Sequence, residues 1–532
     1  MVTNTERLRA FFNNRWLVFV ASMWVQSVAG VGYLFGSISP IIKGTMGYNQ
    51  KQISYLGVVK NLGDCIGFAA GALSEILPFW GVLLVGVLQN FFGYGFLWLI
   101  ISNKWTSLPL WVLCIAIFVG NNGETYYNTA ALVSCVLNFP DNRGSIVGIL
   151  KGFSGLSGAI LSQTYHIFSA TNRASLILTI AVCPSIVVLT LMFAIRFVDE
   201  NRQKRPSDKL SFSFVYGICL ILAAYLMGSL LLEDHMIPSL SILCSIILLI
   251  ILLLPLIVPI TLTFSSQVHD PIEETLIPES RKYTYEETEP IMSDEERRKR
   301  VPKLGENHTF KETLLTTEFW LMFVSLILGS GCGITIIDNM GQICESLGYS
   351  NTRIFVSIIS ICNFLGRVVG GYFSELVVRH YAYPRLVALA IVQFILGIGL
   401  LYYTMGWPAS IYTLTVLTSL GYGAHWAILP AAVSEMFGLK SFGALYNLVT
   451  LATPIGSFVF SSGLASRIYD YNAEEQAKMQ LRNEEDSLTC MGSVCYSQTC
   501  AILCLVICVA IVLSLIVVRR TRCIYKHLYE KL

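Results

Sequence analysis

Apolar runs of about 18 residues or more recur along almost the whole chain, and they restrict the fold more than any other feature. A helix of about 20 residues can cross the hydrocarbon core of a bilayer with its backbone hydrogen bonds satisfied internally. The composition agrees, because 54% of the 532 residues are hydrophobic and only 13% are charged. Soluble proteins carry roughly 25% charged residues. The sequence therefore predicts an all-α polytopic membrane protein with about 14 transmembrane helices.

One long charged segment divides the predicted spans into two groups. The spans are 16–40, 52–76, 78–102, 108–137, 144–168, 174–196, 211–232, 239–264, 318–344, 352–378, 384–405, 408–436, 441–465 and 498–519. Residues 265–317 are rich in charge and poor in apolar side chains, so we expect a mostly disordered loop there. The predicted organisation is an N-terminal six-helix half, an inserted pair of helices, this loop, a C-terminal six-helix half and a tail, at residues 1–198, 199–264, 265–317, 318–520 and 521–532.

Lys and Arg are distributed unevenly between the two ends of the predicted helices. With the N-terminus in the cytosol, most of the 36 basic residues lie in cytosolic segments, which include the loop 265–317. Cytosolic loops carry such an excess, so we expect both termini in the cytosol. The segment 466–497 then lies on the opposite side, where a Cys490–Cys495 disulfide is chemically permitted. The net charge of +2 does not suggest a nucleic-acid partner.

Short motifs of the first half recur in the second half in the same order. Gly30-Val31-Gly32 recurs as Gly331-Cys332-Gly333, and Gly71-Ala72-Leu73-Ser74-Glu75 recurs as Gly371-Tyr372-Phe373-Ser374-Glu375. Motifs repeated in register predict two halves with the same orientation in the membrane. This arrangement resembles that of the major facilitator transporters, in which two such halves surround a central site.

The second copy of the longer motif is similar to the superfamily pattern Gly-x-Leu-x-Asp-Arg-x-Gly-Arg between the second and third helices. The residues that match it best are Gly371, Ser374, Glu375 and Arg379, and Arg367 lies one turn earlier on the same predicted helix. The resemblance implies a conformational lock, in which an acidic and a basic group hold one state closed. The first copy keeps Glu75, but residues 77–82 contain no basic side chain, which puts that half of the lock in doubt.

Longer segments resemble one family of this superfamily, the plant nodulin-like proteins. The segments are Trp16-Leu17-Val18-Phe19-Val20-Ala21, Gly32-Tyr33-Leu34-Phe35-Gly36-Ser37, Asn61-Leu62-Gly63-Asp64, Gly120-Asn121-Asn122-Gly123-Glu124-Thr125-Tyr126 and Asn138-Phe139-Pro140. The resemblance covers nearly the whole chain, including the extra helices, the central loop and the late cysteine pair. It implies a membrane transporter that is distantly similar to oxalate–formate and monocarboxylate carriers, and it does not fix a substrate.

The segment Gly120–Asn128 interrupts the predicted span 108–137 with two Asn, a Glu, a Thr and a further Asn. Such groups are costly in lipid, so they turn inward and mark a functional pathway. Stripes at helical spacing extend this set on other spans. The predicted pathway residues are Gln26, Tyr33, Asn121, Asn122, Glu124, Tyr126, Asn128, Lys151, Asp338, Tyr422, His425 and Trp426, with Tyr446 and Asn447 as further candidates.

The charged members of this set allow more than one interpretation. Lys60 and Asp64 are four residues apart, and we favour an ion pair between them. Lys151 has no acidic neighbour at that spacing, so it is either a gate or snorkelling residue or a cation that binds an anion. Glu124 is the best candidate for proton coupling, with a hydrogen-bonded structural acid as the alternative. For His425, a satisfied structural histidine is favoured over a proton relay.

Several chemistries have no counterpart in the sequence. There is no nucleotide-binding loop of the Gly-rich Lys-Ser/Thr type, no Cys/His metal cluster and no credible nucleophile elbow. We therefore expect a protein that is not an enzyme, that has no cofactor or metal, and that is not driven by nucleotide hydrolysis. Its expected partners are a small-molecule substrate, a proton and the lipid bilayer, and we expect a monomer.

The predicted function is secondary active transport of a small organic anion, such as a monocarboxylate, by alternating access. Proton coupling through Glu124 or Asp338 is a hypothesis. One alternative cargo is a neutral solute or a metal chelate. A second alternative is a non-transporting sensor or scaffold that acts through the central loop. The sequence leaves open whether the membrane is the plasma membrane or the vacuolar membrane.

Overall fold

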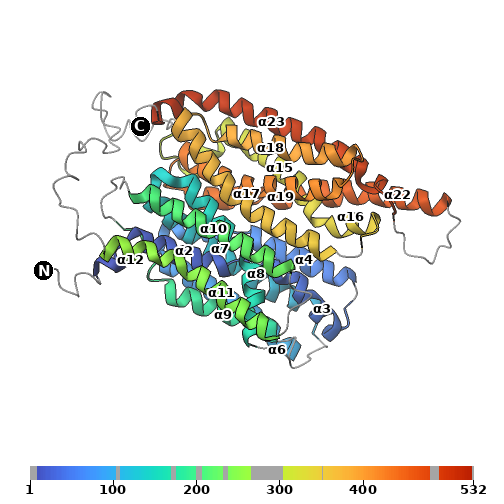
Figure 1. The fold of residues 1–532 in the computed structure, drawn as a ribbon, viewed down its shortest axis with the longest axis horizontal. Coiled ribbons are helices and arrows are strands. Elements are labelled where there is room, and N and C mark those ends of the chain that lie inside the picture. The colour runs from blue at the N-terminus through green and yellow to red at the C-terminus, as the bar shows by residue number, and fades with distance from the viewer. Residues whose placement is uncertain are drawn as a thin grey trace.

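The computed structural model describes residues 9–48, 50–102, 108–168, 175–198, 207–231, 238–264, 304–349, 352–479 and 490–529. Every regular element within these ranges is a helix. Figure 1 shows two bundles that lie side by side, a lower one in blue to cyan and an upper one in yellow to red. Both ends of the chain lie on the left of that view. We call this the terminal end of the molecule, and the opposite end the distal end.

The two halves repeat one order of helices. In the N-terminal half these are α2 (Arg15–Val28), η1 (Val31–Leu34), α3 (Phe35–Met46), α4 (Gln50–Cys65), α5 (Phe68–Ile76), α6 (Phe79–Ser102), α7 (Leu110–Asn138), η2 (Pro140–Asn142), α8 (Arg143–Phe168) and α9 (Ser175–Leu191). In the C-terminal half they are α14 (Phe310–Leu314), α15 (Thr317–Asp338), α16 (Met340–Ser346), α17 (Thr352–Tyr381), α18 (Leu386–Thr404), α19 (Ser410–Met436), α20 (Phe442–Thr450), α21 (Ala452–Gly456), η6 (Ser457–Ala465), α22 (Ser466–Met479) and α23 (Val494–Tyr529).

Within the described residues, 11 helices are long and apolar enough to cross a membrane. Three predicted spans fall outside this set for identifiable reasons. The first is broken after Val28, the sixth is α9 with only 17 residues, and the fourth is α7. Helix α7 has 29 residues, but its polar run Gly120–Asn128 lowers the hydropathy of the segment. The exceptions therefore mark a broken helix, a short helix and a polar helix.

The first membrane helix is interrupted near its middle. Helix α2 ends at Val28, and Ala29 (φ −93°, ψ 31°) and Gly30 (φ −139°, ψ 46°) leave the helical conformation before the 3₁₀ turn η1. An interruption within a membrane exposes backbone groups that need partners from the surrounding protein. The first helix of the C-terminal half, α15, runs without interruption from Thr317 to Asp338.

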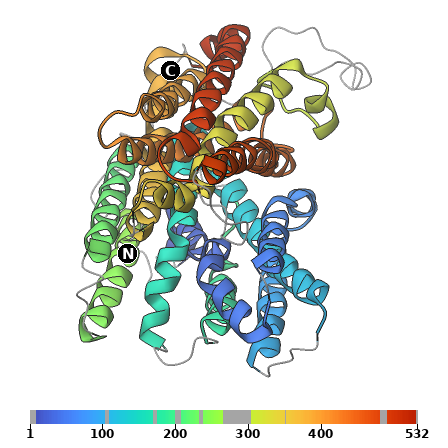
Figure 2. The ribbon, with the colours of Figure 1, turned by 90° about the vertical axis from the view of Figure 1, so that its right-hand side faces the viewer.

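The inserted helices α10 (Ser207–Leu231), α11 (Pro238–Leu253) and α12 (Ile257–Phe264) lie along one side of the molecule (Figure 2). Asp208 at the start of α10 forms an ion pair with Arg15 and accepts a hydrogen bond of 3.1 Å from the Trp16 indole. The ring of Tyr216 in α10 packs edge-on against Tyr372 in α17, with centroids 5.1 Å apart. The inserted helices therefore contact both halves.

The end of the predicted disordered loop is structured, which corrects that prediction for residues 304–316. Gly305 N–H donates to Met436 O (2.7 Å), and Asn307 Oδ1 accepts from Leu439 N–H (3.0 Å) in the α19–α20 connection. Thr309 and Glu312 form a capping box at α14. Backbone and side-chain hydrogen bonds from Thr309 lower the pKa of Glu312. These local bonds order the segment, whereas residues 265–303 lie outside the described part.

Candidate functional site

The polar run of α7 is buried and is held mainly by α4. Asn121 donates to Lys60 O (3.0 Å) and to the Asp64 carboxylate, and it accepts a hydrogen bond of 2.8 Å from Tyr94. Asn122 donates to Gly63 O (2.9 Å) and Ile66 O (2.8 Å), where α4 ends. These carbonyls have lost their helical partners at the break between α4 and α5, so the Asn122 amide replaces them. Two of the predicted pathway residues therefore fasten α7 to α4.

Glu124 lies against the interruption of the first helix. Its Oε1 accepts a hydrogen bond of 2.6 Å from Gly32 N–H, and its side chain is buried. The carbonyl of Gly32 is bound as well, because Lys60 Nζ donates to Gly32 O (3.2 Å). The Glu124 side chain, from α7, thus satisfies a backbone N–H of the interrupted helix. Lys60, from α4, is a second donor to Gly32 O, which also accepts from Phe35 N–H.

The predicted Lys60–Asp64 ion pair is wrong. Among the described contacts, Lys60 binds Gly32 O and lies 6.0 Å from the centre of the Phe35 ring, while Asp64 accepts from Asn121. The i, i+4 spacing on α4 allows the pair, but each side chain has a partner on another helix.

Two cations from different halves meet at the centre of the molecule. Lys151 in α8 is buried, donates to Asn128 Oδ1 (3.1 Å) and lies 4.7 Å from the centre of the Tyr446 ring. No carboxylate of the described residues lies within ion-pair distance of Lys151. Arg367 in α17 donates to the carbonyl of Lys151 (2.5 Å) and to Asn363 Oδ1 (3.1 Å). A positive site therefore lies at the seam between the halves.

The position of Arg367 corrects its assignment to the conformational lock. It lies eight residues before Glu375 on α17, which is about 12 Å along the axis at 1.5 Å per residue. That distance places it beside Lys151 instead of beside the ion pairs at the end of the helix. The sequence pattern predicts correctly which helix carries Arg367, but not the residues that Arg367 contacts.

Glu375 is the centre of an ion-pair network at the terminal end. Its carboxylate accepts from Arg379 (2.8 Å) and from Arg385 (2.8 Å). Arg385 is completely buried and also pairs with Glu435 of α19 (2.6 Å). The predicted lock contains Glu375 and Arg379, but sequence reasoning missed Arg385 and Glu435.

The internal repeat carries a signal for one of these two residues. Val433-Ser434-Glu435 stands in the second half where Val133-Ser134-Cys135 stands in the first half. A carboxylate at a buried position that holds a cysteine in the other copy indicates a specific partner. Nothing in the sequence identifies that partner as Arg385, because the two residues are far apart in the chain.

The same network joins the two halves. Gly144 N–H at the start of α8 donates to Glu375 (3.0 Å), and Arg379 donates to Asp141 O (2.6 Å). In the other direction, Arg143 donates to Ser434 O (2.6 Å). The charged residues of the lock therefore close the molecule at the terminal end.

Glu75, the counterpart of Glu375, takes part in no ion pair among the described residues and is exposed to solvent. Lys440 of the other half influences it electrostatically from the α19–α20 connection. Close packing joins the halves here: a side chain at Gly71 would place its Cβ 2.7 Å from the Cα of Ala444. The first half of the lock is a backbone contact between α5 and α20.

The remaining predicted residues do not form one group. Gln26 is buried, and its amide atoms have no hydrogen-bond partner within the described structure. His425 donates from Nδ1 to Gly421 O (2.7 Å) and packs against Gly329 inside the C-terminal half. Asp338 is exposed and accepts from Ser457 (2.9 Å).

Packing contacts describe the surroundings of the aromatic members of the set, with the exception of Tyr33. Tyr126 packs against Gly86, Tyr422 packs against Gly333, and Trp426 is buried in α19. The side chain of Tyr33 lies outside the described part. Of the two further candidates, Asn447 donates to Thr129 Oγ1 (2.9 Å) across the seam between the halves. Together with Tyr446 at Lys151, it brings α20 to the central site.

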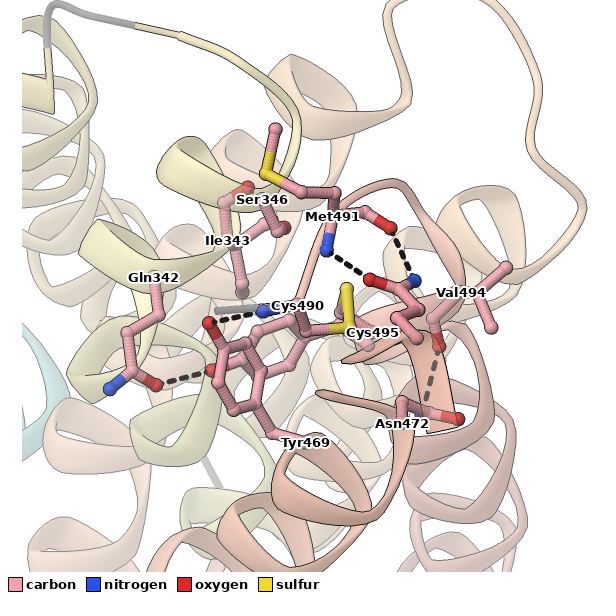
Figure 3. Close-up of a disulfide and its surroundings, with 11 residues drawn as sticks. Gln342, Ile343, Ser346, Tyr469, Asn472, Cys490, Met491, Val494 and Cys495 are labelled. Carbon is pink, nitrogen blue, oxygen red and sulfur yellow. Dashed lines mark hydrogen bonds between the residues drawn. A yellow bond between two sulfur atoms is a disulfide. The ribbon is translucent and has the colours of Figure 1, made fainter. Parts of the chain in front are cut away.

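The distal end carries a disulfide between Cys490 and Cys495 (Figure 3). Cys490 N–H donates to the Tyr469 hydroxyl (3.2 Å), and Gln476 exchanges two hydrogen bonds of 2.8 Å with the backbone of Met491. Gly492 N–H donates to Ser346 O (2.7 Å) at the end of α16. The bridged segment thus connects α22, α16 and the start of α23.

Comparisons with known proteins match two long segments of the chain. Residues 15–260 match a family model described as Nodulin-like, and residues 304–527 match the model of the NFD4 C-terminal domain. Protein NUCLEAR FUSION DEFECTIVE 4 of Arabidopsis thaliana is 25% identical over 544 residues, covering 98% of this chain and 92% of the relative. A probable transporter MCH1 of Yarrowia lipolytica is 23% identical over 205 residues, covering 36% of this chain and 40% of the relative.

Solved structures show the same fold at low sequence identity. FucP, a major facilitator transporter in the outward conformation, is similar with a TM-score of 0.51 at 12% identity, covering 95% of this chain and 99% of FucP. A double-Trp mutant of XylE is similar with a TM-score of 0.53 at 13% identity, covering 93% of this chain and 94% of the XylE chain. The predicted fold class and family resemblance are confirmed, and the similarities support a membrane transporter. The chain is an integral, multi-pass membrane protein whose residues 15–260 match the Nodulin-like family and whose fold is that of the major facilitator transporters.

Proposed function

We propose that this protein is a secondary active transporter that carries a small organic anion, such as a monocarboxylate, by alternating access. The observation that carries the proposal is the pair of cations at the seam between the halves. Lys151 and Arg367 come from different halves, and Lys151 has no carboxylate of the described residues within ion-pair distance. A buried cation without a counter-ion is costly, so an anionic substrate is a natural partner for it.

The closed terminal end supports the alternating-access part of the proposal. Glu375, Arg379 and Arg143 bind across the halves there, and Gly71 packs against α20. Opening that end requires these bonds to break, while the contacts at the seam near Lys151 exchange. The lock thus defines one of the two states between which such a transporter moves.

We further propose that the terminal end faces the cytosol of either the plasma membrane or the vacuolar membrane. The excess of Lys and Arg in segments on this side supports the orientation. The disulfide at the distal end also supports it, because disulfides persist outside the reducing cytosol.

Uptake into proteoliposomes tests the substrate class. The purified full chain is offered labelled monocarboxylates, a dicarboxylate and a hexose, with and without an inward proton gradient. We expect uptake of one carboxylate, stimulated by the gradient, and a loss of about tenfold or more in Lys151→Ala, equivalent to about 1.4 kcal/mol. Lys478→Ala, at an exposed lysine of α22, is the control and should keep wild-type uptake.

Two results would contradict the proposal. Uptake of the hexose, unchanged in Lys151→Ala, would assign the site to a neutral solute. Absence of uptake of every probe, in protein shown by its melting transition to be folded, would favour a non-transporting role.

A further inference from the structure

We propose that Glu124 is the coupling carboxylate and that it acts through the backbone of the first helix: the ionised carboxylate holds Gly32, and proton binding releases it. The inference rests on the proposed function and adds to it the residue and the moving part. The moving part is the interruption at residues 29–34, which we call the first-helix break.

The break is held on both faces of one residue. Gly32 N–H donates to Glu124 Oε1 at 2.6 Å, and Gly32 O accepts from Lys60 Nζ at 3.2 Å. Glu124 belongs to α7 and Lys60 to α4, so the position of the break depends on two other helices. A Cβ at Gly32 would lie 3.0 Å from Asp64 Oδ2, so a side chain there would require the carboxylate to shift by a few tenths of an ångström.

The charge of Glu124 decides how firmly the break is held. A hydrogen bond to an ionised acceptor is roughly twice as strong as one to a neutral acceptor. Protonation of the carboxylate by a proton from solvent forms one O–H bond, removes the negative charge and thereby weakens the bond to Gly32. The Lys60 contact to Gly32 O then remains, together with the bond from Phe35 N–H to the same carbonyl.

Groups on each neighbouring helix face Glu124 and share its response to pH. Asp64 and Lys60 act on it from α4, Tyr94 lies close on α6, and Lys151 interacts with it from α8. The first helix itself contributes backbone N–H groups. Of these groups, Asp64 carries a charge of the same sign as Glu124, and Lys60 and Lys151 carry the opposite charge.

Glu124 is also connected to the central cation. Asn128, one turn further along α7, donates to Glu124 O (3.1 Å) and accepts from Lys151 Nζ (3.1 Å). An anion that draws Lys151 away from Asn128 would therefore act on the same turn of α7 that carries the carboxylate. This provides a physical route between substrate binding and proton binding.

The C-terminal half lacks this device. Its first helix, α15, is continuous through Gly331 and Gly333. In the register set by Val133 and Val433, the position of Glu124 corresponds to Ala424, which is buried and apolar. A general consequence of the fold would be present in both halves, so the contact with Gly32 is a specific feature of the first half.

Hydrogen exchange of the full chain in nanodiscs, without substrate, tests the contact. After correction for intrinsic exchange, we expect the amides of residues 29–36 in the wild type to exchange about tenfold faster at low pH than at high pH. Glu124→Gln should exchange at the faster rate at every pH. Glu345→Gln, at an exposed glutamate of α16, should behave like the wild type.

A second variant tests the contact from the side of the backbone. Gly32→Ala leaves the charge of Glu124 intact but crowds Asp64, so we expect fast exchange at high pH as well. Gly44→Ala is the matched control, because a Cβ at Gly44 meets no atom within 4 Å. Protection of residues 29–36 that is independent of pH in the wild type, or a pH response retained in Glu124→Gln, would overturn the inference.

Transport separates this inference from the proposed function. We expect Glu124→Gln to exchange labelled for unlabelled anion across the membrane but to lose stimulation by a proton gradient. If Asp338→Asn loses the stimulation and Glu124→Gln keeps it, the inference is wrong although the function stands. If the wild type carries no anion, the proposed function fails, and hydrogen exchange still decides whether Glu124 holds the break.

Discussion

The two halves share an order of helices but use several of their buried charges differently. In the N-terminal half, Lys60 and Glu124 lie in the middle of the bundle and bind the backbone of an interrupted helix. In the C-terminal half, Arg385 and Glu435 lie at the terminal end and belong to an ion-pair network. Two copies of one fold can therefore acquire different roles when charged residues occupy different positions along corresponding helices. One half holds a movable segment, and the other half closes an end.

The two halves also use different means at the equivalent positions of the lock. Glu375 has two arginine partners at 2.8 Å, whereas Glu75 is exposed and the closure beside it depends on the contact of Gly71 with α20. Buried ion pairs tolerate no missing partner. Backbone contacts tolerate no added volume. The two sides of the terminal end should therefore fail under different substitutions.

Arg385→Leu should have the largest effect. It leaves Glu375 and Glu435 buried with one partner fewer, which costs about 3–5 kcal/mol in comparable cases. We expect a large fall in the melting temperature of the purified protein. Arg520→Leu, which removes the more exposed pair with Glu318, should cost about 0–1 kcal/mol. Equal falls in melting temperature in the two variants would show that the buried ion pairs of Arg385 stabilise the protein no more than the exposed pair of Arg520.

Gly148→Val should have an intermediate effect at the contact between α8 and α17. The added Cβ would lie 2.6 Å from Arg367 O, so the helices must separate, at about 1–3 kcal/mol for overpacking. We expect faster hydrogen exchange in residues 140–150 and a lower melting temperature. Gly95→Val, where a Cβ meets no atom within 4 Å, is the matched control. Unchanged exchange in Gly148→Val would mean that close packing does not hold the terminal end.

Loss of the distal disulfide should have the smallest effect of the three on closure. The bridge spans a sequence separation of 5, and closing so short a loop contributes about 2 kcal/mol in the chain-entropy model. Cys490→Ser should lower the melting temperature but leave hydrogen exchange of residues 140–150 unchanged. Cys508→Ser, at an exposed free cysteine, is the control. Faster exchange at the terminal end in Cys490→Ser would show that the two ends are coupled.

Much of the fold could be predicted from local patterns. Each predicted span lies on described helices, and the repeated motifs identified two halves in one orientation. The polar run of α7 was recognised because its residues cannot face lipid, and they are buried in the structure. These predictions depend on properties that a single helix carries in its own sequence.

The partners of the charged residues could not be predicted in this way. Spacing along α4 suggested that Lys60 pairs with Asp64, but Lys60 binds Gly32 O on the first helix. Spacing along α17 grouped Arg367 with Glu375, but Arg367 contacts α8 at Lys151. Each choice depends on which helices pack together and at what level.

Four properties could be predicted from the order of the amino acids: a membrane protein, two repeated helical halves, a buried polar helix and a charged motif in each half. The reason is that hydropathy, helical period and motif order are properties of the chain alone. The packing of the helices was needed to show that Glu124 binds the first-helix break, that Arg367 binds the Lys151 carbonyl and that Arg385 pairs with Glu435. Those contacts join residues far apart in the chain, and a buried charge takes the partner that helix packing brings within hydrogen-bond distance.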